Sequence, residues 1–236
     1  MKPNVYEDAF TAPTGDIKPA DATDFWHLSN GVRVELRPVQ PQDSPLLSAM
    51  IERLSPQTKY NRFHGAIHNL TSTLLRYLSC VDQYRHVAFV LTTQQNGEEH
   101  IIADARYVVD EGACAESAEF AIMVDDHWQR FGLAEHAIHA LTAAASKNGL
   151  RWLHGDVLAE NCPMLALMKR CQFCCTPDKS DEKMIRAEIL LSAIDQRLTT
   201  LPNTPISFGY LILQWVKSAK KFLHQLPHGG RNAKLT

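Results

Sequence analysis

The chain has 236 residues and is 45% hydrophobic, which is enough to bury the core of one full domain. Its formal net charge of −2 argues against a dedicated nucleic-acid-binding protein. Six cysteines without a signal-peptide pattern favour reduced thiols and therefore a cytoplasmic protein.

Residues 1–27 are predicted to form a disordered leader, because they are polar, contain three prolines and lack a long apolar run. Residues 28–191 are predicted to form the main domain, in which Asn96-Gly97 predicts a hairpin turn. In chain order, alternation and capping residues predict a strand over 32–37, helices over 44–54 and 72–81, strands over 86–93, 100–108 and 118–124, a helix over 133–146, a strand over 150–157, a helix over 161–170 and a strand over 184–191. This order predicts an α/β fold with a mixed, mostly antiparallel central sheet flanked by helices.

Residues 192–236 differ from the domain in composition and are predicted to form a basic helical extension. From residue 201 onward the segment has five Lys or Arg residues and no Asp or Glu. Apolar residues recur there at helical spacing: Phe208, Ile212, Trp215, Ala219, Phe222 and Leu226. We expect this amphipathic helix to pack on its own domain or on a second subunit of a homo-oligomer. Contact with an anionic membrane surface is the alternative.

The loop between the strand over 118–124 and the helix over 133–146 has the features of an anion-binding site. A helix that begins after a short loop presents unpaired N–H groups and the positive end of its dipole. Gly132 and the small Ala134 allow a ligand to approach the backbone closely. A phosphate or pyrophosphate is the ligand that suits such a site best.

This loop, written Gln129-x-x-Gly132-x-Ala134, resembles the Gln/Arg-x-x-Gly-x-Gly/Ala signature of the GNAT acetyltransferases. The strand over 150–157, the helix led by Asn161 and the later Phe173 follow in the GNAT order. Residues 28–190 are further similar to the acetyltransferase domain of the bacterial Pat-like protein-lysine acetyltransferases, for example in the Ala-Glu-Phe-Ala-Ile segment at 118–122. The resemblance implies a GNAT fold and acetyl-CoA as the acyl donor.

The resemblance also implies which residues bind acetyl-CoA. In GNAT enzymes the strand before the loop pairs with pantetheine, and the loop and helix start bind the pyrophosphate. The residues expected to do so here are Ile122, Met123, Val124, Gln129, Arg130, Phe131, Gly132, Leu133, Ala134 and Glu135, together with Asn161.

Glu119 is the candidate general base, because it is the only acid in an otherwise apolar strand and matches the glutamate of Pat-like enzymes. Burial should raise its pKa toward the working pH. An outward-facing carboxylate at the sheet edge is the alternative, and Glu116 is a weaker candidate. Met168 stands where many small-molecule GNAT enzymes have a Tyr acid. Cys171-Gln172 precedes Phe173 where an apolar residue and Gly are usual, which leaves the local turn open.

No metal site is expected, since Cys171, Cys174 and Cys175 lack a second ligand pair, and His136 and His139 lack a third ligand. The sequence therefore favours an acetyl-CoA-dependent N-acetyltransferase that acts on an amine, with a protein lysine as the expected acceptor. Two alternatives remain: an acetyltransferase for small-molecule amines, and a non-catalytic module that binds acyl-CoA and regulates another protein.

Overall fold

The computed structural model describes residues 24–63, 70–112 and 116–191. Eight strands form one mixed sheet in the order β1-β2-β3-β4-β5-β6-β8-β7. The strands are β1 (Asp24–His27), β2 (Arg33–Pro38), β3 (His86–Gln95), β4 (Glu98–Val109), β5 (Ser117–Val124), β6 (Trp152–Leu158), β7 (Cys174–Pro177) and β8 (Met184–Leu190). The helices are α1 (Ser44–Arg53), α2 (Pro56–Phe63), α3 (Ser72–Ser79), α4 (Leu133–Lys147) and α5 (Cys162–Arg170), with single 3-10 turns η1 (Pro41–Asp43) and η2 (Asp126–Trp128).

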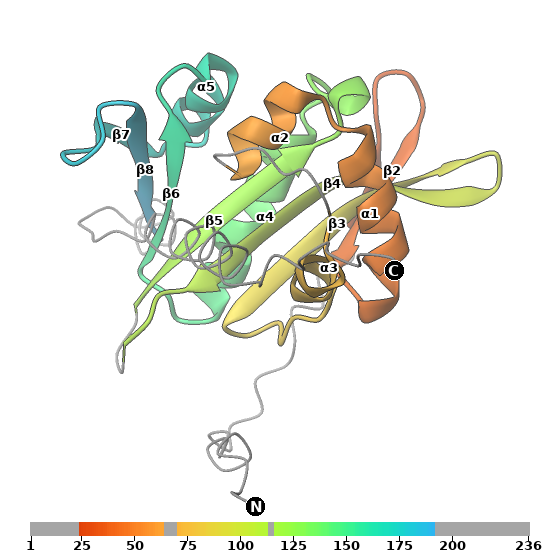
Figure 1. Cartoon of the computed structure of the whole chain (residues 1–236), viewed down its shortest axis with the longest axis horizontal. Helices are drawn as coiled ribbons and strands as arrows, with labels where there is room; N and C mark the ends of the chain where they lie inside the picture. Colours follow the sequence, from red (N-terminus) through yellow and green to blue (C-terminus); the bar gives the residue numbers. More distant parts are fainter. Residues whose placement is uncertain (1–23, 64–69, 113–115, 192–236) are drawn as a thin grey trace, which may run out of the picture.

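All neighbouring strands are antiparallel except β5 and β6, which are parallel and pair over only three positions, from Ser117 with Trp152 to Glu119 with His154. The two strands separate beyond this short contact (Figure 1). The fold is therefore the predicted GNAT fold, with a mixed, mostly antiparallel sheet.

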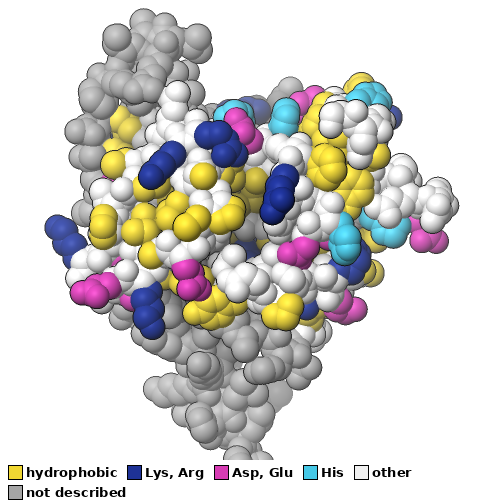
Figure 2. Space-filling model, turned by 90° about the horizontal axis from the view of Figure 1, so that it is seen from above, with side chains coloured by type: hydrophobic (Ala, Val, Ile, Leu, Met, Phe, Trp, Pro, Cys, Tyr) yellow, Lys and Arg dark blue, Asp and Glu magenta, His cyan; other side chains and the backbone are white. Residues whose placement is uncertain are grey.

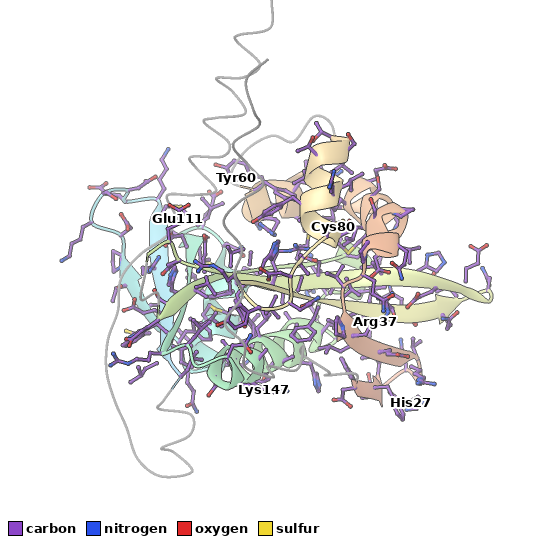
Figure 3. All side chains as sticks on the ribbon, turned by 90° about the horizontal axis from the view of Figure 1, so that it is seen from below. His27, Arg37, Tyr60, Cys80, Glu111 and Lys147 are labelled. Carbon is purple, nitrogen blue, oxygen red and sulfur yellow. The ribbon has the colours of Figure 1, made fainter. Side chains whose placement is uncertain are left out.

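The helices cover both faces of the sheet. Helices α1, α2 and α3 lie in front of it in Figure 1 and α4 lies behind it. In Figure 3 the labelled Tyr60 of α2 and Lys147 of α4 accordingly lie on opposite sides of the sheet. The larger core cluster joins the α4 face to residues such as Phe89 and Phe120, and a second cluster joins α1 and α3 to residues such as Val90.

Local chemistry explains several element boundaries. Asn96 and Gly97 both adopt positive φ, 53° and 84°, as a two-residue hairpin of this type requires. The Thr71 side chain accepts a hydrogen bond from the Leu74 N–H at 3.1 Å and so caps α3. Gln172 adopts a φ of 66° after α5, and thereby makes the turn that Gly makes elsewhere.

Each predicted strand and helix of the domain is present, with ends shifted by no more than a few residues, and three short elements were not predicted. Asp24–His27 was assigned to the disordered leader, but it forms β1 and pairs with β2. The ring of Trp26 in β1 stacks on the ring of His136 in α4, at 4.3 Å between centroids, which holds this strand in place. The other two unpredicted elements are α2 and β7.

Residues 1–23 of the predicted leader and the predicted helical extension over 192–236 lie outside the described residues. Within the described ranges, no helix is both long enough and apolar enough to cross a membrane.

Candidate active site

The free edge of β5 begins where its pairing with β6 stops. The N–H of Asp125 donates to Ile102 and the C=O of Ser117 accepts from Asp110, so odd-numbered residues of β5 direct their backbone groups toward β4. Backbone groups alternate in direction along a strand, and the even-numbered residues therefore face β6. Consistent with this, the C=O of Glu116 accepts hydrogen bonds from the β6 side.

Beyond Phe120, which still lies against β6, the groups that face β6 belong to Ile122 and Val124, and no strand pairs with them in the described part of the chain. The Gln129 side chain donates to the Val124 C=O at 3.2 Å. Met123 was predicted to contribute with its two neighbours, but its backbone groups face β4, where it pairs with Asp104. The open edge therefore offers the backbone N–H and C=O of Ile122 and the N–H of Val124 to a ligand.

The loop that follows β5 presents a row of N–H groups. Arg130 and Gly132 adopt positive φ, 68° and 80°, on either side of Phe131. Gly132 is the N-cap of α4 and accepts backbone hydrogen bonds from residues 135 and 136. No carbonyl or side chain among the described residues accepts from the N–H groups of residues 130–134. This arrangement fits a pyrophosphate, because several N–H groups without an acceptor lie at the start of a helix, where the helix dipole is positive.

A cavity of about 1100 Å³ joins the free edge to this loop. Its walls come from α2, β5, the start of α4, the end of β6, α5 and the loop before β8. All predicted site residues line it except Phe131, which is exposed and contacts the ring of Trp128. At the end of the molecule where α2 and α5 lie, hydrophobic side chains gather in patches with Lys or Arg beside them (Figure 2). Such a surface suits a ligand with an apolar arm and anionic groups.

Two consecutive aspartates attach α1 and α2 to the loop after β5. Asp125 is buried and pairs with Arg53 at 2.9 Å. Asp126 accepts hydrogen bonds from the N–H and hydroxyl of Ser55, each at 2.8 Å, and from the hydroxyl of Thr58 at 2.7 Å. These bonds position the start of α2 against the loop that precedes α4.

Glu119 lies in this cavity with a side chain that is only 9% exposed. Burial raises its pKa to about 8, and the nearby carboxylate of Asp156 adds to the rise, whereas Arg62 and Arg186 oppose it. Glu119 is thus not an outward-facing edge carboxylate. Glu116, the weaker candidate, is exposed and pairs with a surface arginine outside the cavity.

A buried polar cluster lies on the same face of the sheet as Glu119. Arg106 pairs with Asp104, and it also contacts His86 Nε2 at 3.0 Å and donates to the Leu78 C=O at 3.0 Å. Burial, aided by Arg106, lowers the pKa of His86 to about 4, so this imidazole is neutral near pH 7. Asp104 and Arg106 are fully buried, and their contacts support the fold.

The α5 region agrees only in part with the predicted roles. Asn161 lines the cavity, but its side-chain oxygen also accepts from the Met164 N–H at 3.3 Å and caps α5. Met168 is fully buried and does not line the cavity. Phe173 packs edge-on against Phe120, with 5.2 Å between ring centroids. The end of α5 therefore supports the wall of the cavity from behind.

Sequence reasoning missed Gly155 and Asp156, which line the cavity from β6. The signal for Asp156 was present, since His154 and Asp156 alternate with apolar residues and so share one face of the strand. Within the described residues, no group of three or more His, Cys, Asp or Glu side chains is arranged to hold a metal ion.

Comparison with known proteins agrees with this geometry. A family model described as the acetyltransferase (GNAT) domain matches residues 33–174. An acetyltransferase of Pseudomonas aeruginosa is 30% identical over 166 residues, covering 69% of this chain and 87% of the relative. The acetyltransferase Pat of Mycolicibacterium smegmatis is 37% identical over 136 residues, which are 57% of this chain but only 39% of that protein. The GNAT domain of S. lividans PAT superposes with a TM-score of 0.64 at 24% identity, covering 71% of this chain and 96% of that domain, which is a likeness of fold.

Proposed function

Because the chain belongs to the GNAT family of acyl-CoA-dependent N-acetyltransferases, we propose that it acetylates the side-chain amine of protein lysines. The observation that supports transfer most strongly is the buried Glu119 beside a free strand edge in one cavity. A module that only binds acyl-CoA has no need of a carboxylate there. The sequence resemblance to Pat-like enzymes supports a protein acceptor. So does the buried Met168, which takes the place of a Tyr acid.

The residues present fit acetyl-CoA. The N–H groups of residues 130–134 suit its pyrophosphate, and the free groups of Ile122 and Val124 suit its amide-containing pantetheine arm. When bound, acetyl-CoA supplies an acetyl group activated as a thioester. We propose that a free N–H of this edge, such as that of Ile122, polarises the acyl carbonyl, and a donor of this kind contributes several kcal/mol to a rate.

Glu119 acts on the acceptor. A lysine amine has an ordinary pKa near 10.4 and is almost wholly protonated at neutral pH, so it must lose a proton before it attacks. Glu119, with a pKa of about 8, is a much stronger base than an exposed carboxylate. In its ionised form, which is the minor form at pH 7 and grows as pH approaches 8, it takes the proton from the lysine directly or through one water molecule. A thiolate with a pKa near 8.5 leaves without a strong acid, which agrees with an apolar Met168.

The proposal is tested by incubating the protein with acetyl-CoA labelled in the acetyl group and with a cell lysate, followed by separation of proteins from small molecules. We expect the label to enter lysine side chains of proteins, and to do so much more slowly with the Glu119→Gln variant. Label that enters only small amines would contradict the protein acceptor. Binding of acetyl-CoA without any transfer would contradict catalysis.

A further inference from the structure

Arg62 occupies an unusual position at the end of α2. Its side chain lines the cavity, and the guanidinium lies over the ring of Phe63, 5.1 Å from the ring centroid. Its Nε is buried and has no hydrogen-bond partner. Among the described residues, no carboxylate lies within 4.0 Å of the guanidinium, so this cation has no ion-pair partner there.

The neighbouring acids do not neutralise Arg62. Asp104 acts on Arg62 electrostatically, but both of its oxygens accept hydrogen bonds from Arg106. Glu119 also lies within electrostatic range, and its raised pKa leaves it largely protonated at neutral pH. His86 is neutral. Arg106 is neutralised by Asp104, and neither Glu119 nor His86 is mainly in its charged form at neutral pH. One positive charge is therefore left over, and it is on Arg62 at the cavity wall.

A buried cation without a partner costs free energy, and a ligand that provides the partner recovers it. The flat guanidinium matches the two oxygens of a carboxylate better than it matches any neutral group. We infer that Arg62 binds a carboxylate of the substrate in the half of the cavity that contains Glu119. This inference rests on the proposed function, because it assigns the class of substrate that the same site prefers.

Two parts of the substrate can bring a carboxylate to this place. One is the acyl chain, if the donor is a dicarboxylic acyl-CoA such as succinyl-CoA. The other is the acceptor, if an acidic residue follows the lysine. The chemistry recognised by Arg62 is the same in both cases, and a binding measurement with matched pairs of ligands distinguishes the two sources.

The experiment measures dissociation constants by calorimetry for two pairs of probes. In the first pair, succinyl-CoA is compared with butyryl-CoA, which has a methyl group in place of the carboxylate. In the second pair, end-blocked peptides with the sequence Lys-Asp or Lys-Asn bind to protein saturated with CoA. We expect the wild-type protein to prefer the carboxylate member of one pair about tenfold, since a charge-assisted bidentate contact is gained. The pair that shows the preference identifies the source.

Three variants assign the preference to Arg62. Arg62→Met should reduce the ratio of the two dissociation constants to a factor near one. Arg62→Lys keeps the charge but loses the two parallel N–H donors of the guanidinium, and it should retain part of the preference. Arg76→Met is the matched control, because Arg76 is exposed on the neighbouring α3 and does not line the cavity. This variant should retain the full preference.

The inference is overturned if the wild-type protein binds both members of each pair equally or binds none of the probes, whatever the variants do. It is also overturned if a folded Arg62→Met protein retains the preference. Because the measurement is of binding, it is independent of turnover. A protein that shows the preference but acetylates no lysine disproves the proposed function alone, and an active lysine acetyltransferase without the preference disproves only the role of Arg62.

Discussion

At the scale of single residues, the proposed chemistry depends on Glu119. Its place in the chain was predicted from a pattern, since it is the one acid in an apolar strand and matches a known glutamate. Its burial and its neighbours were not predictable in the same way. Asp156 and Arg62 act electrostatically on Glu119 from a different strand and from a helix that precedes it by more than fifty residues. Such proximity follows from the packing of distant segments, which one sequence does not reveal.

Replacement of Glu119 by Gln keeps the size of the side chain and removes the base. The turnover rate should fall on the order of 10²-fold, in line with the contribution of a general base. Because the pKa of Glu119 is raised to about 8, the wild-type rate should rise as pH increases through that value, and the variant should lose this step. Steady-state rates between pH 6 and 9 measure both effects, and calorimetry should find acetyl-CoA affinity nearly unchanged. Near-normal turnover in the variant would rule out Glu119 as the base.

Gly132 tests the anion site of the loop. An added Cβ meets no atom within 4 Å, and Asn and Asp both tolerate the positive φ of 80° better than other side chains. Gly132→Asp therefore adds mainly a negative charge beside the free N–H groups, and the affinity for acetyl-CoA should fall roughly tenfold or more. Gly132→Asn, which has the same size and no charge, is the control and should lose much less. Equal affinities of the two variants would show that no anion binds there.

At the scale of elements, the separation of β5 and β6 opens the cavity, and Gly155 lies at the point of separation. A Cβ on Gly155 would be 2.9 Å from a ring carbon of Phe120 and 3.0 Å from the Phe120 carbonyl oxygen. The two strands therefore approach too closely there for any residue other than Gly, unless one of them moves.

Gly155→Ala should consequently lower the free energy of unfolding by about 1–3 kcal/mol, the usual cost of overpacking. It should also weaken acetyl-CoA binding, because the strands that form the cavity are pushed apart. Chemical denaturation and calorimetry measure the two effects. The double variant with Phe120→Leu removes the ring contact and should recover part of the stability. A Gly155→Ala protein as stable as the wild type would mean that the contact is easily relieved.

The elements with clear periodicity were all predicted, and the missed ones have physical reasons. The strands β1 and β7 have four residues each and lie at the two edges of the sheet, so no long alternation marks them. Pro56 lies just beyond the predicted helix over 44–54, where a proline is typical of a helix end, but it is the first residue of α2, where proline is also well tolerated. The error at α2 mattered most, because this helix brings Arg62 to the cavity.

At the scale of the whole molecule, the cavity walls come from segments spread over more than a hundred residues, from Ser55 to Met184. The site therefore forms only when the complete domain is folded. Burial of Glu119 in that wall links its protonation to the stability of the entire fold.

This linkage predicts how stability depends on pH. The folded-state pKa of Glu119, about 8, lies above its ordinary value of 4.5, so between these values the folded protein holds a proton that the unfolded chain has lost. The contribution of Glu119 to the free energy of unfolding is therefore complete below about pH 4.5 and is lost as pH rises to about 8. Glu119→Gln cannot ionise, and its stability relative to the wild type should increase across this window. Urea unfolding at intervals between pH 5 and 9 measures the difference, and a difference that stays constant would contradict the buried position of Glu119.

The alternating direction of backbone groups in β5 has a consequence for how this chain can change in length. Deletion or insertion of one residue directly after Glu119 would reverse the direction of the backbone groups of Ile122 and Val124, which would then face β4. The side chain of Glu119 would then lie on the wrong side of the strand relative to the loop that follows. A change of two residues would keep every group on its side and move it along the strand by one repeat, roughly 7 Å. We therefore expect insertions and deletions in this strand to abolish the site. The turn at Asn96-Gly97 does not line the cavity and can accept inserted residues.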